Sequence, residues 1–338
     1  MSEGRVAISG IDTHWGEALA LALSETDEVQ HILGLGSRQP TVRLDKMEFV
    51  QLDLRHPMLE EVLGSHGIGA VAHLDVEHVL GTMHLASAAA NVGVRRLVLF
   101  SSMRAYGARH NNPSFIGEDR RIARGPSDRD LYEIETFLAD HQRARPDLGI
   151  VVLRFGWILG PRAQTPFSRY LDRRVVPTLL GFDPHFQLVH ERDVVRALSH
   201  SLRRVDPQGV QGPPWRGVFN VAGDGVIPLS RILKRCGRTG VPVPHPLVYS
   251  AQRWVASLGR EDLPFEVDFL RYSVIGSTEK MRTAMNFEPA HTGEDAVEAY
   301  VRSRRGSAGG PIVAALSALE AGAGRLATLL PIRGGRVR

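Results

Sequence analysis

The sequence predicts a doubly wound, parallel α/β sheet, followed by a smaller C-terminal α/β domain and a helical tail. Two observations lead to this fold class. Short apolar segments alternate with helical ones through the first half of the chain, which is the pattern of right-handed crossovers between parallel strands. In addition, Gly10 follows the first apolar segment directly, and Gly16 stands where the first helix is expected to begin.

Each element has its own signal in the sequence. Strands are expected in the short apolar runs, and helices in the longer runs whose apolar residues recur every three or four positions. The predicted strands are 5–9, 29–35, 49–53, 70–74, 96–101 and 150–155, and the predicted helices are 16–23, 56–63, 76–92 and 128–143. The tight turn at Gly10 and the close helix approach at Gly16 make the fold Rossmann-type, with a helix N-terminus that faces an anion.

The rhythm breaks near residue 160, where prolines accumulate and the elements become shorter. We therefore expect a Rossmann NAD(P)-binding-like domain over residues 1–157. A smaller substrate-type domain should cover residues 158–305, with segments that can return to the first domain. Residues 306–338 are expected to form a linker and an amphipathic basic tail.

Composition is that of an ordinary globular protein. Hydrophobic residues make up 43% and charged residues 23% of the 338 residues, which excludes a chain disordered throughout. The sequence has neither an uncharged apolar run of 18 residues nor the layout of a signal peptide. Cys236 is the one cysteine, so an intrachain disulfide and a thiolate metal cage are excluded. We expect a cytoplasmic protein without a metal site.

The net charge of +4 comes from the tail, since residues 301–338 hold seven Arg and one Glu. A nucleic-acid-binding protein would more often carry its basic patch on the folded body, so no nucleic acid is expected as a partner. Apolar residues between 312 and 330 recur at spacings of four and three, which predicts an amphipathic helix. Two alternatives stay open for 311–338: packing against its own domain or a protein partner, or contact with an anionic membrane surface.

Several motifs follow one another along residues 5–303: a glycine turn at 9–16, QLDL at 51–54, FSSMRAYG at 100–107, LRFGWILGP at 153–161, LVHERD at 188–193 and GVFNVAG at 217–223. In this order they resemble the extended short-chain dehydrogenase/reductases of the NAD-dependent epimerase/dehydratase family, typified by UDP-galactose 4-epimerase. The resemblance implies NAD(P) as cofactor and a nucleotide-sugar or related secondary alcohol as substrate. It also implies a homodimer formed through the helices at 76–92 and 126–144.

The resemblance places the cofactor on the glycine turn and the strand ends. Gly10 and Gly16 match the first and last glycines of the family's TGxxGxxG, and Thr13 stands where the middle glycine would let the pyrophosphate approach. Asp53 matches the acidic residue that contacts the adenine. Leu74 follows the strand end that lies along the cofactor.

Cofactor choice depends on the end of the second strand, where NAD-using members usually carry an acidic residue for the ribose hydroxyls. This chain has Ser37 and Arg38 there, and the guanidinium of Arg38 can pair with a 2′-phosphate. The pattern therefore favours NADP slightly over NAD. The alternative interpretation is that 36–40 is a solvated turn.

The family's chemistry needs a Tyr that moves a proton and a Lys four residues later that lowers its pKa. The alignment puts Ser127 at the Tyr position and Leu131 at the Lys position. No lysine of the chain has a tyrosine four residues before it, so the YxxxK motif is absent. Ser102 matches the catalytic serine, and the acidic pair at 118–119 is a candidate replacement for the proton carrier.

Three functions stay open at this point. The first is an NAD(P)-dependent epimerase/dehydratase or reductase in which Ser102 polarises the substrate oxygen. The second is a catalytically silent relative that binds a nucleotide or serves as a scaffold or accessory subunit. The third is an anchoring protein whose active part is the tail.

Asp75 adds a carboxylate near the expected pyrophosphate, which is unfavourable unless it is paired.

Overall fold

The computed structural model describes residues 4–76, 78–120, 122, 129–173, 175–202, 216–244 and 263–304. The predicted linker and tail at 306–338, the predicted amphipathic helix within it, and Ser127 all lie outside the described residues. In the part that is described, no helix is both long enough and apolar enough to cross a bilayer.

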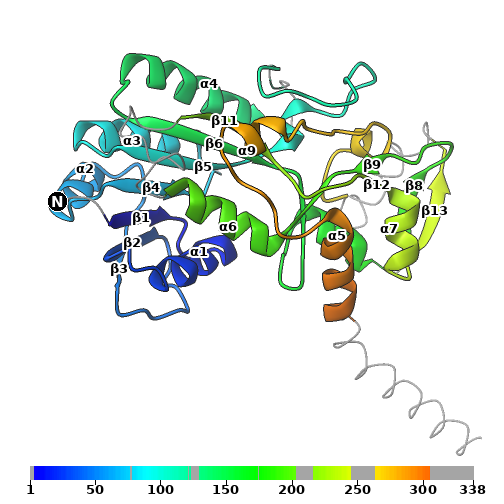
Figure 1. Ribbon diagram of the computed structural model, residues 1–338, viewed down its shortest axis with the longest axis horizontal. Helices are drawn as coiled ribbons and strands as arrows, with labels where there is room; N and C mark the ends of the chain where they lie inside the picture. The colour runs from blue at the N-terminus through cyan, green and yellow to red at the C-terminus, as the bar shows by residue number, and fades with distance from the viewer. Residues whose placement is uncertain are drawn as a thin grey trace, which may run out of the picture.

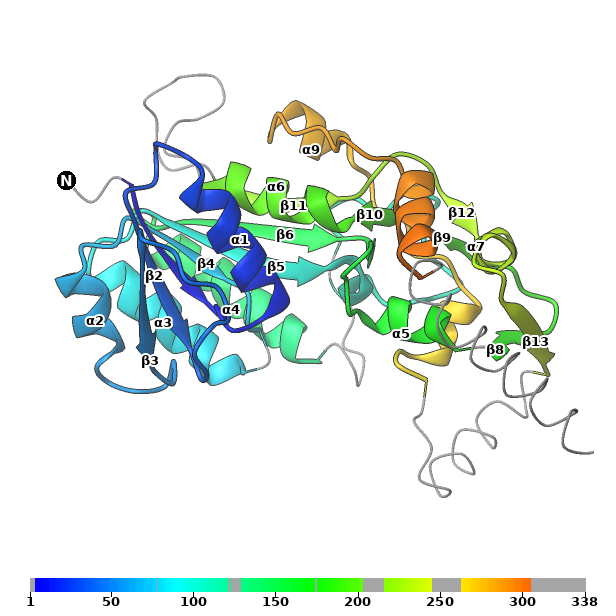
Figure 2. The same ribbon diagram turned by 90° about the horizontal axis from the view of Figure 1, so that it is seen from below.

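A parallel sheet with helices around it forms the larger part of the molecule, on the left in Figures 1 and 2. In the described residues it has seven strands, in the order β11-β6-β5-β4-β1-β2-β3. The strands are β1 (Arg5–Ser9), β2 (His31–Gly36), β3 (Met47–Gln51), β4 (Ala70–His73), β5 (Arg96–Ser102), β6 (Gly149–Phe155) and β11 (Gly217–Val221). The strand order reverses between β1 and β4, and ligands of such sheets bind at the carboxyl ends on either side of this point.

Helices cover both faces of the sheet, so the predicted doubly wound α/β fold is confirmed. The helices α2 (Leu59–Ser65), α3 (Val79–Asn91) and α4 (Arg129–Ala144) share one aliphatic core with the sheet. The helices α1 (His14–Ser24) and α6 (Glu191–Leu202) pack together against the other face. The predicted elements agree with the observed ones to within a few residues; β2, for example, begins at His31 where 29 was expected.

The second half of the chain supplies both a smaller lobe and parts of the main sheet. Strand β11 pairs with β6 and thereby extends the sheet at its edge. The lobe contains short paired strands, which are β7 (Trp157–Leu159) with β10 (Leu188–His190), β9 (His185–Phe186) with β12 (Ile227–Pro228), and β8 (Val175–Leu179) with β13 (Thr239–Val243). Its helices include α5 (Pro166–Asp172), α7 (Leu229–Arg235) and a helix over residues 293–304. Its core is aromatic, because the Trp157 ring lies 5.1–5.4 Å from four phenylalanine rings.

Candidate active site

The candidate site lies at the carboxyl edge of the sheet, where β1, β2, β4 and β5 end. The glycine turn after β1 closes tightly. Gly10 has a φ of +77°, which an L side chain rarely adopts, and its amide donates to the carbonyl oxygen of Leu35 at 2.9 Å. A Cβ placed on Gly16 would lie 2.2 Å from the carbonyl oxygen of Gly10. Helix α1 can therefore approach the strand this closely only with glycine at position 16.

Thr13 holds the same turn together. Its hydroxyl accepts a hydrogen bond from the amide of Gly16 at 3.1 Å and donates to the carbonyl oxygen of Gly10 at 2.7 Å. It is thus the N-cap of α1, a role for which threonine is well suited. The side chain that replaces the middle glycine is bound to the turn itself, and it leaves the N-terminus of α1 directed at the carboxyl edge.

Asp12 is a functional candidate that the sequence interpretation missed. Its carboxylate accepts a hydrogen bond from the hydroxyl of Ser37 at 3.1 Å and lies 3.5 Å from Nε of Arg38. A Cβ on Gly36, the last residue of β2, would be only 2.6 Å from Oδ1 of Asp12. The glycine turn therefore brings a carboxylate to the strand end at which NAD-using relatives carry their acidic residue. The sequence signal was an acidic residue inside the turn.

Asp53 follows the end of β3 and Leu74 follows the end of β4, and β1 and β2 lie between these two strands. The carboxylate of Asp53 forms a fork with the guanidinium of Arg55, at 3.0 Å to Nε and 2.5 Å to Nη2. These hydrogen bonds hold the pKa of Asp53 well below its ordinary value. Leu74 is buried, and its amide donates to the carbonyl oxygen of Ser9. The next residue, Asp75, lies against the glycine turn: a Cβ added to Gly10 would be 2.9 Å from the Cβ of Asp75.

His73 ends β4 and is fully buried beneath this edge. Its Nδ1 lies 2.7 Å from the hydroxyl of Ser9, and its Nε2 lies 2.8 Å from the hydroxyl of Thr82. Burial lowers the pKa of His73 to about 3, so the ring is neutral near pH 7. Both nitrogens are used within the protein, and His73 ties β1 and α3 to β4.

Ser102 ends β5 at the same edge and is half-buried. Its Oγ accepts a hydrogen bond from the amide of Arg104 at 3.2 Å, as the N-cap of the 3-10 helix η1 (Met103–Tyr106). Because this bond uses the hydroxyl as an acceptor, its proton can be donated elsewhere. Of the acidic pair, Glu118 accepts a hydrogen bond from the amide of Asn220 at 3.0 Å, whereas Asp119 is exposed.

A buried ion pair occupies the space between β5, β6 and α4. Arg154 and Glu135 have side chains only 6% and 5% exposed and meet at 2.6 Å. Glu135 also accepts a hydrogen bond from the hydroxyl of Ser101 at 2.6 Å. Leu131 stands one helical turn before Glu135, so the two lie on the same side of α4. The sequence interpretation did not foresee this pair.

Tyr106 belongs to the same network and is unsuited to moving protons. Its hydroxyl accepts a hydrogen bond from Nη1 of Arg154 at 2.7 Å and donates to Oδ1 of Asn220 at 2.8 Å. Burial raises the pKa of Tyr106, so the phenol stays protonated. The tyrosine of the SSMRAYG segment therefore has a structural role.

Comparison with known families decides the assignment. The model of the NAD dependent epimerase/dehydratase family matches residues 6–222. The chain belongs to this family. It is 28% identical over 327 residues to the uncharacterized protein Rv0501 of Mycobacterium tuberculosis, a match that covers 88% of this chain and 84% of the relative.

Solved structures of this epimerase/dehydratase type share the fold. MoeE5 in complex with UDP-glucose and NAD has a TM-score of 0.67 at 18% identity, over 90% of this chain and 99% of that one. UDP-glucose 4-epimerase of Thermotoga maritima, solved with UDP-glucose, has a TM-score of 0.67 at 19% identity, over 90% of this chain and 99% of that one. At these identities the likeness establishes the fold alone.

Proposed function

We propose that the protein binds a nicotinamide dinucleotide at the carboxyl edge of its sheet and acts there on a nucleotide-sugar or related secondary alcohol. The observation that carries this proposal is the glycine turn. Gly10 adopts a positive φ, Gly16 is in near contact with the backbone of that turn, and α1 begins directly behind it. A turn of this kind with a helix N-terminus behind it is suited to a diphosphate. Membership of the epimerase/dehydratase family supports the same cofactor.

Each residue of the carboxyl edge would have its own role in binding or catalysis. The turn from Gly10 to Gly16, with Thr13 as its brace, would hold the diphosphate, and the side chains near β2 and β3 would hold the adenosine. Leu74 would border the cofactor at the end of β4. A bound dinucleotide would accept or return a hydride at the substrate carbon. Ser102 would donate a hydrogen bond to the substrate oxygen and so polarise and orient it, while another group would move the proton.

Cofactor choice rests on two residues, Arg38 after the end of β2 and Asp12 in the glycine turn that faces it. Arg38 is 82% exposed and can turn toward a 2′-phosphate, which is the basis of the NADP preference. The carboxylate of Asp12 faces the same guanidinium, and it can accept hydrogen bonds from the ribose hydroxyls of NAD. NADP binding would require Arg38 to outweigh Asp12, so single substitutions at these two positions separate the alternatives.

A second function, a catalytically silent dinucleotide-binding protein, is favoured by the face of α4. Leu131 stands where the family's lysine would be, and the phenol of Tyr106 is buried and doubly hydrogen-bonded. No side chain of the described carboxyl edge takes over the pair of roles that Tyr and Lys have in the family. Asp119, which is exposed, is the candidate proton carrier of the acidic pair. A silent protein would keep the binding half of the site and lose the proton relay.

Turnover with added UDP-glucose and either dinucleotide distinguishes the two functions. An enzyme should convert substrate, and Ser102→Ala should lower its kcat by about 10²-fold or more. A silent protein should bind the dinucleotide and show no turnover, with Ser102→Ala leaving binding unchanged. If neither dinucleotide binds, both functions are wrong.

Partners beyond the substrate are proposed from the sequence. A homodimer would use the helices that correspond to α3 and α4, and Leu80 of α3 is 69% exposed.

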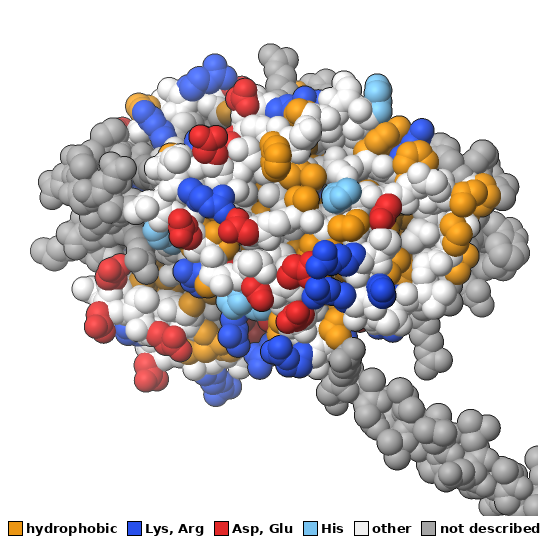
Figure 3. All heavy atoms as spheres, turned by 45° about the vertical axis from the view of Figure 1, so that its right-hand side comes forward, with side chains coloured by type: hydrophobic (Ala, Val, Ile, Leu, Met, Phe, Trp, Pro, Cys, Tyr) orange, Lys and Arg blue, Asp and Glu red, His pale blue; other side chains and the backbone are white. Residues whose placement is uncertain are grey.

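On the face drawn in Figure 3, acidic and basic side chains are interspersed, unlike the single-sign patch of a nucleic-acid-binding surface. Deleting residues 306–338 and measuring co-sedimentation with anionic liposomes tests the membrane role of the tail; unchanged binding would exclude it.

A further inference from the structure

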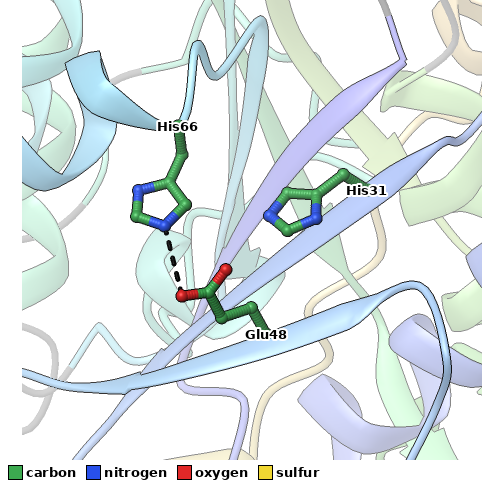
Figure 4. Close-up of side chains that lie close together, drawn as sticks. All are labelled: His31, Glu48 and His66. Atoms are coloured by element: carbon green, nitrogen blue, oxygen red, sulfur yellow. Dashed lines mark ion pairs between the residues drawn. The ribbon is translucent and has the colours of Figure 1, made fainter.

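Three side chains converge at the opposite, amino edge of the sheet. His31 is the first residue of β2, Glu48 lies near the start of β3, and His66 follows the last turn of α2 (Figure 4). One potential ligand atom from each of the three lies within 4.8 Å of the others. Strand β2 has six residues, about 20 Å, so this cluster is separate from the carboxyl edge.

The hydrogen bonds of His66 prepare one ring nitrogen for a cation. Its Nδ1 lies 2.7 Å from the carbonyl oxygen of Val62, and a carbonyl only accepts, so Nδ1 must carry the proton. The other nitrogen, Nε2, faces Oε1 of Glu48 at 3.4 Å. A neutral His66 would direct a lone pair at this carboxylate, which is unfavourable unless a proton or a metal ion lies between them. Histidines that bind metals commonly donate their other N–H to a carbonyl in this way.

His31 completes the set with a nitrogen that has no partner. Its Nε2 is buried and makes no hydrogen bond to the described residues. An imidazole binds a metal ion through the lone pair of such a ring nitrogen. The rings of His31 and His66 lie nearly parallel, 15° apart, with centroids 6.0 Å apart.

We propose that His31, Glu48 and His66 bind a zinc ion. Two imidazole nitrogens and one carboxylate oxygen form a common zinc ligand set, and zinc bonds of about 2.0–2.1 Å put neighbouring tetrahedral ligands about 3.4 Å apart. The separation of Nε2 of His66 from Oε1 of Glu48 is 3.4 Å, so this pair already has the required spacing. Small rotations of His31 and Glu48 would close the remaining separations.

The exposure of the cluster and the charges around it indicate the role of the ion. The cluster is partly exposed, which leaves the fourth position to water. Arg5 donates from Nη1 to the carbonyl oxygen of His66 at 2.8 Å, and its positive charge would weaken zinc binding while Glu48 strengthens it. The ion would join the first residue of β2, the start of β3 and the end of α2. We assign it to stabilisation of this edge, remote from the candidate active site.

Calorimetric titration of the full, chelator-treated chain with Zn²⁺ tests the site, with Co²⁺ absorption as a second readout. The wild type should bind one ion with micromolar or tighter affinity and give the intense visible bands of tetrahedral Co²⁺. Glu48→Gln and His31→Ala should each weaken binding at least about tenfold. His185→Ala removes an exposed histidine outside the cluster and should leave binding unchanged.

Two results would overturn the site: a wild type that binds no Zn²⁺, or cluster variants that bind it as tightly as the wild type does. Far-UV circular dichroism of each variant shows whether the chain is folded. Glu48→Gln keeps the side-chain shape and changes only its charge, so it decides the question if His31→Ala fails to fold. Binding of the dinucleotide should be unchanged in all of these variants.

Discussion

The two halves of the carboxyl edge differ in what they retain. The half around β1 and β2 keeps the backbone features of a dinucleotide site: a positive φ at Gly10, a capped α1 and near contact at Gly16. In the half around β5 and α4, Ser102 is the proposed match to the family's catalytic serine, and Leu131 is the proposed match to its lysine position. The polar groups of this half, Glu135 and Tyr106, are used in a buried network with Arg154.

This difference shows which parts of a site tolerate change. A diphosphate is held largely by backbone amides and a helix dipole, so its site can tolerate a side chain such as that of Thr13 in place of the family's middle glycine. Proton transfer needs particular side chains at particular distances. A chain can therefore lose proton transfer while the packing of the helix against the strand still preserves the diphosphate-binding turn.

The largest effect is expected in the network half. Glu135→Gln would leave the guanidinium of Arg154 buried without its counter-charge, which typically costs about 3–5 kcal/mol. Glu133→Gln, on the same helix, removes an exposed pair with Arg129 and should cost less than about 1 kcal/mol. Urea unfolding measures both; equal costs would show that the buried pair does not have the structural role given to it here.

In the binding half, Gly16→Ala should be nearly as costly. The added Cβ would lie 2.2 Å from the carbonyl oxygen of Gly10, and such overpacking costs about 3 kcal/mol at the upper end of its range. The control is Gly64→Ala in α2, where the nearest atom would be 3.4 Å away. We expect that control to be neutral or stabilising in the same unfolding experiment, and Gly16→Ala to abolish dinucleotide binding. A variant that keeps full stability and binding would contradict the near-contact argument.

His73 gives this edge a pH dependence. Its pKa is about 3 in the folded chain and about 6.5 when unfolded, so below pH 6.5 the unfolded chain takes up a proton that the folded chain does not. Stability should be unaffected by this group above pH 6.5 and should fall as the pH drops toward 3, by about 2 kcal/mol at pH 5.

The difference between wild type and His73→Gln isolates that dependence. The variant should show a flatter fall in unfolding free energy between pH 7 and pH 5, whereas His185→Gln, an exposed control, should keep the wild-type slope. Parallel slopes for wild type and His73→Gln would mean that His73 is accessible to protons in the folded chain.

The smallest effects concern cofactor choice. If Arg38 sets the preference, Arg38→Ala should lower NADP affinity about tenfold, or about 1.4 kcal/mol, and leave NAD affinity unchanged. If Asp12 sets it, Asp12→Asn should lower NAD affinity by a similar factor. Calorimetry of both variants with both dinucleotides decides between them, because a preference for NADP set by Arg38 requires the first result.

The sequence was most informative where local patterns determine structure. Alternating apolar runs predicted the strands and helices of the sheet, and the spacing of Gly10 and Gly16 predicted the turn between β1 and α1. The buried pair of Arg154 and Glu135 could not be predicted in this way, because it depends on how α4 packs against β6. His31, Glu48 and His66 come together only through the pairing of β2 with β3 and the return of the chain from α2.

Calorimetric titration of the purified protein with NADP and then NAD, each in both redox states, tests the central claim most directly. The account predicts micromolar binding of at least one dinucleotide, because the turn, the capped helix and the near contact at Gly16 are all in place. The absence of binding for both would contradict it. In that case the glycine turn would be a structural remnant, and the search for a function would move to protein partners and the tail.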